Sequence, residues 1–110
     1  MVKRFTVGNV TVGAVLDMIP PPRDAIDFFP EVTEKQWAPY RDDVLVDGQV
    51  QLYYGHFFVR SEGKTIMVDT GMGPGPHPTR ANRKGNLLNE LDRHGVTPAD
   101  IDIVVHTHLH

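Results

Sequence analysis

Alternating apolar and polar positions predict two β-hairpins in the first part of the chain. Residues 10–18 alternate over most of their length, and a Gly-Asn pair joins them to the short run at residues 4–7. Residues 50–60 and residues 65–69 are rich in β-branched and aromatic side chains, which predicts the second hairpin. The strand over residues 65–69 is apolar on both faces, so we expect it to be a central, covered strand.

Residues 19–43 interrupt this pattern as an insertion rich in proline and aromatic residues. Pro20, Pro21 and Pro22 exclude a central strand and predict a stiff loop. Thr33 and Gln36 have the spacing of a capping box, which predicts a short helix. The insertion carries four large aromatic side chains: Phe28, Phe29, Trp37 and Tyr40. We expect these to pack against the sheet; the alternatives are the wall of an apolar substrate pocket or a homodimer contact.

One helix is predicted between the second hairpin and the last strand. Residues 85–95 place leucines on one face, with Asn86 at the N-cap and Gly95 just past the C-terminus. A strand over residues 101–105 follows. Strand, helix and strand in this order predict a layered α/β sheet. Strands of the same direction would end at one edge, where α/β sheets build their sites.

Composition narrows the kind of partner and the kind of metal site. The formal net charge is −3 and there is no run of like charges, which argues against a nucleic-acid partner. The N-terminus lacks the apolar run of a signal peptide and no segment could span a membrane, so we expect a cytoplasmic protein. The chain has no cysteine, so a metal would be bound by nitrogen and oxygen ligands.

Three histidines follow the last predicted strand at alternate positions: His106, His108 and His110. If the extended geometry continues, their imidazoles point to one side with Cα atoms ~6–7 Å apart. Neighbouring imidazoles could then share an ion through metal–nitrogen bonds of ~2.0–2.1 Å. From spacing alone, a metal site and a tag or coincidence stay equally open. Because ligating imidazoles must be neutral, metal affinity should fall below about pH 6.

Three further residues are candidates for the same site. Asp69 follows the central strand, where it could cap a turn or orient a ligand histidine from behind. His56 lies in an aromatic strand and is expected to be a packed, hydrogen-bonded core residue, with ligation as the minority reading. His77 lies in a loop of glycine and proline and is expected to be solvated, with substrate contact as its minority reading.

The run Val-Val-His-Thr-His-Leu-His resembles the opening of the His-x-His-x-Asp-His motif of the metallo-β-lactamase superfamily, with His108 and His110 as its first two histidines. Asp69 resembles the aspartate of that superfamily's other early motif. The resemblance covers most of the chain from about Gln51 onward. The motif's aspartate and third histidine would lie beyond His110. The resemblance implies an α/β fold, the N-terminal half of an αββα sandwich, with residues 1–110 as a partial domain cut inside the metal motif.

The activity that this resemblance implies is metal-dependent hydrolysis, with a metal-bound water or hydroxide attacking a carbonyl substrate. His108 and His110 would ligate the first of two Zn²⁺ ions, with Mn, Fe or Co as alternatives. Asp69 would orient the metal ligands without binding the metal itself. His106 is expected to pack or hydrogen-bond behind the metal site, with ligation as its minority reading. The best guess for the small-molecule substrate is a lactone or small ester of the acyl-homoserine-lactone kind; a glutathione thioester or a β-lactam stays open.

Two alternatives to a hydrolase stay open. One is a redox or non-catalytic metal-binding member of the same fold. The other is a fragment that acts only as a binding module, in which case its sheet would present an exposed apolar face and open edges. We expect the 110-residue chain alone to be inactive, because it supplies only two of the metal ligands that the resemblance implies.

Overall fold

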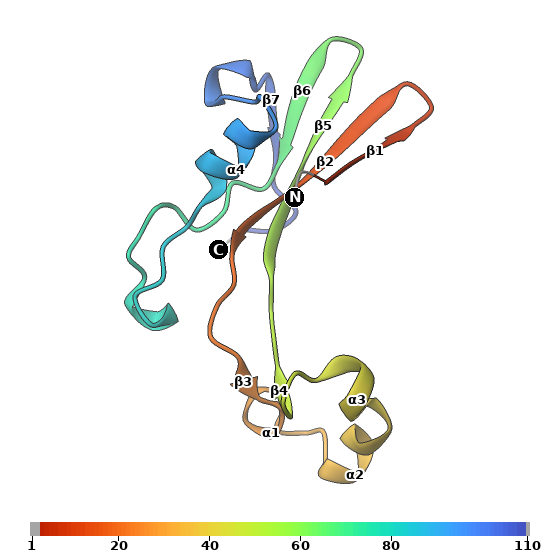
Figure 1. Ribbon diagram of the computed structural model, residues 1–110, viewed down its shortest axis with the longest axis vertical. Coiled ribbons are helices and arrows are strands. Elements are labelled where there is room, and N and C mark those ends of the chain that lie inside the picture. Colours follow the sequence, from red (N-terminus) through yellow and green to blue (C-terminus); the bar gives the residue numbers. More distant parts are fainter. Residues whose placement is uncertain (1–2, 110) are drawn as a thin grey trace.

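A mixed five-stranded sheet forms the main body of the protein, for which a computed structural model describes residues 3–109 (Figure 1). Its strands lie in the order β1-β2-β5-β6-β7. Their bounds are Lys3–Val7 (β1), Val10–Met18 (β2), Tyr54–Ser61 (β5), Lys64–Val68 (β6) and Ile103–Val105 (β7). Neighbouring strands pair antiparallel except β6 and β7, which pair parallel. Both predicted hairpins are therefore confirmed, and the ends of β6 and β7 share one edge.

The strand predicted over residues 50–60 is divided in two. Gln49–Val50 forms a separate short strand, β4, and pairs with Arg23–Asp24, β3. Between β4 and β5 the Gln51 side-chain amide donates to the carbonyls of Pro20 and Leu52, at 2.8 and 3.0 Å. Residues 51–53 therefore connect the insertion to the sheet and do not themselves form a strand.

One face of the sheet is covered by helix α4 (Leu87–Arg93). Val15, Phe58 and Met67 come from three neighbouring strands and pack together on this face with Leu91 and Val96. Each of the five is at most 2% exposed. Burial of a side chain of this size contributes ~1.5–3 kcal/mol, so this cluster holds the helix on the sheet.

Asp17, at the end of β2, joins helix α4 to the glycine-rich loop that follows β6. It is 2% exposed. Its Oδ1 accepts the N–H groups of Asn86 at 2.8 Å and Leu87 at 3.0 Å, and its Oδ2 accepts that of Met72 at 3.0 Å. Asn86 occupies the N-cap as expected, but its side chain accepts no capping hydrogen bond. The Asp17 carboxylate caps the helix instead, where a negative charge also suits the helix dipole.

Replacing Asp17 with alanine should destabilise the protein by about 3 kcal/mol, because buried N–H groups would lose their acceptor. Urea denaturation would measure this as a lower free energy of unfolding. Asp17→Asn keeps one acceptor oxygen and should cost less. Asp43→Ala, at an exposed position in another part of the chain, is the control and should change stability by no more than ~0.5 kcal/mol. Equal losses for Asp17→Ala and the control would contradict the capping role.

His94, at the C-cap of α4, is a structural residue. It is 5% exposed and lies edge-on to the Phe58 ring, with ring centroids 5.1 Å apart. Arg4 Nε donates to His94 Nδ1 at 3.1 Å, and His94 Nε2 lies 3.1 Å from the Ala14 carbonyl oxygen. Nδ1 is therefore an acceptor and Nε2 the donor, which describes a neutral ring. Burial lowers the pKa of His94, and the Arg4 guanidinium acts in the same direction.

A lowered His94 pKa makes the fold sensitive to acid. The unfolded chain takes up this proton near pH 6.5, whereas the folded protein resists it. Stability from neutral His94 is therefore present above about pH 6.5 and is lost as the pH falls through the folded pKa. We expect His94→Gln, which can still donate to Ala14, to show a smaller loss of unfolding free energy between pH 7 and pH 5 in urea titrations. An unchanged loss would show that other groups carry the acid sensitivity.

Residues 19–53 form a small lobe apart from the sheet (Figure 1). Besides β3 and β4 it contains Ala25–Phe28 (α1), Glu34–Trp37 (α2), the 3₁₀ helix Ala38–Tyr40 (η1) and Arg41–Val44 (α3). The capping box before α2 is confirmed: Thr33 Oγ1 accepts from Gln36 N–H at 3.3 Å and Gln36 Oε1 accepts from Thr33 N–H at 2.8 Å. Within residues 3–109, no helix is long and apolar enough to cross a membrane.

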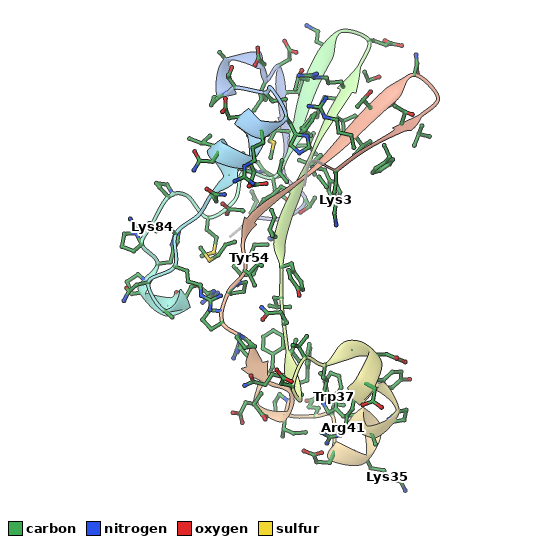
Figure 2. The ribbon with its side chains drawn as sticks, in the orientation of Figure 1. Lys3, Lys35, Trp37, Arg41, Tyr54 and Lys84 are labelled. Atoms are coloured by element: carbon green, nitrogen blue, oxygen red, sulfur yellow. The ribbon has the colours of Figure 1, made fainter. Side chains whose placement is uncertain are left out.

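The expectation that the insertion's aromatic residues pack against the sheet is wrong. Phe29 packs against Phe28 and Trp37, with ring centroids 4.6 and 6.0 Å apart, so these rings contact one another within the lobe, where Phe29 remains 44% exposed. Figure 2 shows Trp37 and Arg41 within the lobe, at a distance from the sheet. The proline segment explains this placement, because its restricted extended backbone carries the chain away from β2. Tyr40 is 57% exposed, so the homodimer contact stays a prediction.

The sheet face opposite α4 is apolar and largely uncovered by residues 3–109. It is formed by the alternate positions of all five strands, and several large side chains on it are 38–64% exposed: Phe5, Val7, Leu16, Phe57, Ile103 and Val105. The exposed apolar face expected for this chain on its own is therefore present.

Candidate functional site

The site begins at Asp69, where the chain turns sharply after β6. Asp69 has φ +58°, a left-handed conformation that aspartate tolerates better than most residues. Its N–H donates to the Val105 carbonyl at 2.8 Å, which extends the parallel pairing by one bond. The strand expected to include Asp69 therefore ends at Val68, and the turn brings the Asp69 carboxylate beside the end of β7.

The Asp69 carboxylate binds Thr107 through both of its oxygens. Thr107 N–H donates to Oδ1 at 2.9 Å, and Thr107 Oγ1 donates to Oδ2 at 2.6 Å. These bonds, the hydroxyl bond first, lower the pKa of Asp69; the nearby His108 and His56 rings act in the same direction. Asp69 is thus held ionised, as a carboxylate that fixes the segment after β7.

The histidines do not continue the strand. β7 ends at Val105, and Thr107 and His108 lie in a bend. The expectation that their imidazoles line one face of an extended strand is therefore wrong for His106 and His108, because the Thr107 backbone is bound to Asp69 and turns. His110 lies outside the described residues.

The bend places two imidazoles around the Asp69 carboxylate. Nδ1 of His106 lies 4.0 Å from Asp69 Oδ1, and Nδ1 of His108 lies 4.0 Å from Asp69 Oδ2. Thr107 Oγ1 also lies 2.7 Å from His108 Nδ1. Because the Thr107 hydroxyl proton is used on Asp69, Oγ1 can only accept from His108, so Nδ1 carries a proton. In the neutral ring the lone pair is then on Nε2, the nitrogen that a metal could use.

These groups line one pocket of about 710 Å³ at the edge of the sheet. Asp69, His106, His108 and His56 all contribute to its wall. His106 therefore lies beside the candidate ligand His108 instead of behind it. His56 is half-buried, and its Nε2 is buried without a hydrogen-bond partner among the described residues, so the expected hydrogen-bonded core role is not what the structure shows.

His77 is not brought into this pocket. Its Nε2 lies 2.9 Å from the Gly73 carbonyl oxygen, inside its own loop, and the ring is partly buried. Tyr54 and Arg80 also line this pocket and were not anticipated from the sequence. No motif or spacing marks them, since one lies in an aromatic strand and the other in a loop of mixed composition.

The donor set around the pocket suits a divalent metal of the Zn²⁺, Mn²⁺, Fe²⁺ or Co²⁺ kind. Imidazole nitrogens and a carboxylate are their usual ligands, and one buried imidazole nitrogen, His56 Nε2, has no protein partner within residues 3–109. The same residues contain no group of three or more histidine, aspartate or glutamate side chains arranged to hold an ion. The described part of the chain therefore offers the chemistry of a metal site but not a complete ligand set.

Comparison with known proteins agrees with this geometry. Residues 57–110 match the family model of the metallo-beta-lactamase superfamily. The match includes His106, His108 and Asp69. A comparison with curated proteins finds no match.

Solved structures of the same fold cover nearly the whole chain. AidC, a dizinc quorum-quenching lactonase solved with the product N-hexnoyl-L-homoserine, superposes with a TM-score of 0.78 at 22% identity, over 99% of this chain and 36% of its own. A probable metal-dependent hydrolase from Staphylococcus aureus gives 0.74 at 18%, over 96% and 40%, and hydrolase AbOPH in the beta lactamase superfamily gives 0.73 at 21%, over 99% and 36%. The expected α/β fold is thus confirmed, and the chain spans well under half the length of these structures.

Removing the Thr107 hydroxyl should raise the pKa of Asp69, since that hydrogen bond is the main cause of its lowering. We expect this in Thr107→Val, measured by following the Asp69 carboxyl carbon in an NMR pH titration. Thr107→Ser keeps the hydroxyl and should leave the pKa low. Since a lowered carboxyl pKa stabilises the fold above about pH 3.9 and this is lost as the pH falls through the folded pKa, Thr107→Val should also lose less stability on acidification. An unchanged Asp69 pKa would contradict the assignment.

Proposed function

We propose that this chain is the N-terminal part of a metal-dependent hydrolase that uses water to cleave a carbonyl substrate, best a lactone or small ester of the acyl-homoserine-lactone kind. The observation that carries the proposal is the meeting of Asp69 with the His106–His108 bend at one sheet edge, in a chain whose residues 57–110 match the metallo-beta-lactamase superfamily. The likeness in fold to a dizinc lactonase supports the choice of substrate.

His108 and His110 are the proposed ligands of the first metal ion, with Zn²⁺ as the expected metal. Asp69 is a positioning residue: through the Thr107 hydroxyl it keeps the proton on His108 Nδ1, so that the lone pair of the neutral ring is on Nε2. His106 and His56 line the same pocket and are the further candidates for ligation. When bound, the metal would lower the pKa of a water toward neutrality and polarise the scissile carbonyl.

Asp69 also contributes by remaining charged. The Thr107 hydrogen bonds lower its pKa and so favour the carboxylate form. A fixed carboxylate beside two imidazoles favours their alignment and the binding of a cation. We therefore propose that Asp69 holds the site and that groups in the pocket in front of it carry out the bond-breaking chemistry.

Metal binding and hydrolysis by the full-length protein test this proposal. We expect Asp69→Asn to weaken Zn²⁺ binding about 10–100-fold and His108→Ala to weaken it further, measured by calorimetry and by metal analysis of the purified protein. Hydrolysis of hexanoyl-homoserine lactone should fall in parallel.

His77→Ala is the matched control, because the His77 ring is hydrogen-bonded to the Gly73 carbonyl away from the pocket. This variant should keep both its metal and its activity. The 110-residue chain serves as a blank, since its described residues lack a three-ligand group. A His108→Ala protein that retains its full metal content and activity would overturn the assignment of the site. Metal binding without hydrolysis of lactone, ester or lactam substrates would favour the redox or non-catalytic alternative.

A further inference from the structure

Arg80 places a guanidinium in the wall of the pocket that contains Asp69 and His108. It is the last residue of a one-turn 3₁₀ helix, Pro78–Arg80 (η2), in the loop between β6 and α4. Within residues 3–109, no aspartate or glutamate lies within ion-pair distance of it. The pocket therefore has a positive charge in its wall that this part of the chain does not pair with an acid.

Tyr54 fixes the direction of this guanidinium. Arg80 Nε donates to the Tyr54 hydroxyl oxygen at 2.9 Å, and the guanidinium carbon lies 5.9 Å from the centre of the Tyr54 ring. Arg80 Nη1 donates to the Thr79 carbonyl at 3.0 Å. A guanidinium has five N–H groups, so these two bonds leave three without a partner among the described residues. Tyr54 lies at the start of β5 (Figure 2), so the anchor belongs to the sheet.

The loop that carries Arg80 is braced by its own backbone. His77 N–H donates to the Arg83 carbonyl at 2.9 Å, and Arg83 N–H donates to the Arg80 carbonyl at 3.1 Å. The Asn82 N–H donates to the His77 carbonyl at 3.0 Å. A cation held by a braced loop and a strand residue loses little freedom when it binds a ligand, which is the condition for selective recognition.

The rest of the pocket mouth is apolar or aromatic. Tyr53, Met72 and Leu109 line it and are 61%, 39% and 89% exposed. An apolar wall with a single directed guanidinium fits a molecule that has a hydrocarbon part and a planar oxyanion. A carboxylate matches the fork of N–H groups better than a neutral oxygen does, because such bonds are charge-assisted and can be bidentate.

We infer that Arg80, aligned by Tyr54, binds a carboxylate of the ligand and thereby selects amphipathic acids. The inference rests on the proposed function in taking this pocket as the substrate site. It adds to the lactones and small esters proposed above a preference for ligands that carry an ionised carboxylate away from the bond that is cleaved.

Calorimetric binding of hexanoate and of its neutral analogue hexanamide to the metal-loaded full-length protein tests this inference. Hexanoate should bind more tightly, and Arg80→Met should weaken hexanoate binding by about tenfold or more while changing hexanamide binding far less. Tyr54→Phe, which keeps the charge but removes its anchor, should weaken hexanoate binding by a smaller factor. The same differences should persist after the metal is removed with a chelator.

Lys84→Met is the matched control. It removes one positive charge from the same loop, and Lys84 is exposed and does not line this pocket (Figure 2). It should leave hexanoate affinity within about twofold, since the Debye length of ~8 Å screens an exposed charge outside the pocket. If Arg80→Met and Lys84→Met lowered hexanoate affinity equally, the effect would be one of net charge and the inference would be overturned. Equal binding of hexanoate and hexanamide by the unmodified protein would also overturn it.

The result of these binding measurements does not depend on whether the protein is a hydrolase. Selective hexanoate binding that depends on Arg80, in a protein without hydrolase activity, would leave this inference standing and remove the proposed function. Lactone hydrolysis that is unaffected by Arg80→Met, in a protein that does not bind hexanoate, would do the reverse.

Discussion

The arrangement around the pocket depends on one buried carboxylate that is not part of it. Asp17 ends β2, and its two oxygens hold the start of α4 and the loop after β6. That loop follows Asp69 and leads to Arg80. Two glycines allow this approach: a Cβ at Gly71 would lie 2.6 Å from Asp17 Oδ2, and one at Gly85 would lie 2.3 Å from the Gly73 carbonyl oxygen. A buried carboxylate is costly unless its oxygens are satisfied, and here backbone N–H groups satisfy it.

A second carboxylate acts at the neighbouring strand end in a similar way. Asp69 receives the N–H and hydroxyl of Thr107, just as Asp17 receives N–H groups of the helix start. The difference is exposure: the Asp69 side chain is 18% exposed and faces a pocket with two imidazoles beside it. Both oxygens of Asp17 accept backbone N–H groups that hold the fold together. Asp69 instead holds the segment that carries the candidate ligands. The position of His108 therefore depends on a relay from Asp69 through Thr107 and on the parallel pairing of β6 with β7.

The strands and the meeting of the two motifs could be predicted because each depends on local pattern. Residues 10–18 and 54–61 alternate or are rich in β-branched and aromatic residues, and the motifs follow two strands that end at one edge. The bend at Thr107 could not be predicted, since alternate histidines fit an extended strand equally well. It is caused by a contact 38 residues apart in sequence. The cap of α4 was missed for the same reason: Asn86 has the right residue type, yet an acceptor 69 residues away supplies the bond.

The insertion and Arg80 show a different limit. Aromatic residues predict burial but not what buries them, and the Phe28, Phe29 and Trp37 rings pack on one another in a lobe that the prolines hold away from the sheet. Arg80 has no neighbour in sequence that marks it as functional. Its role depends on Tyr54, 26 residues earlier, and on the pocket that both line. Only the folded arrangement distinguishes it from exposed cations such as Lys84.

The strand that positions the candidate ligands is exposed at all three of its positions. Ile103, Val104 and Val105 in β7 are 45–47% exposed, so within residues 3–109 this strand depends on its pairing with β6 and on the Asp69 contacts. Any structure that covers these apolar side chains stabilises β7, and the same contacts then fix the bend at Thr107. Binding of an ion to histidines in that bend would stabilise the strand in turn, because a ligand that binds only the folded state shifts the equilibrium toward it. Covering of the sheet and formation of the metal site are therefore thermodynamically coupled through β7.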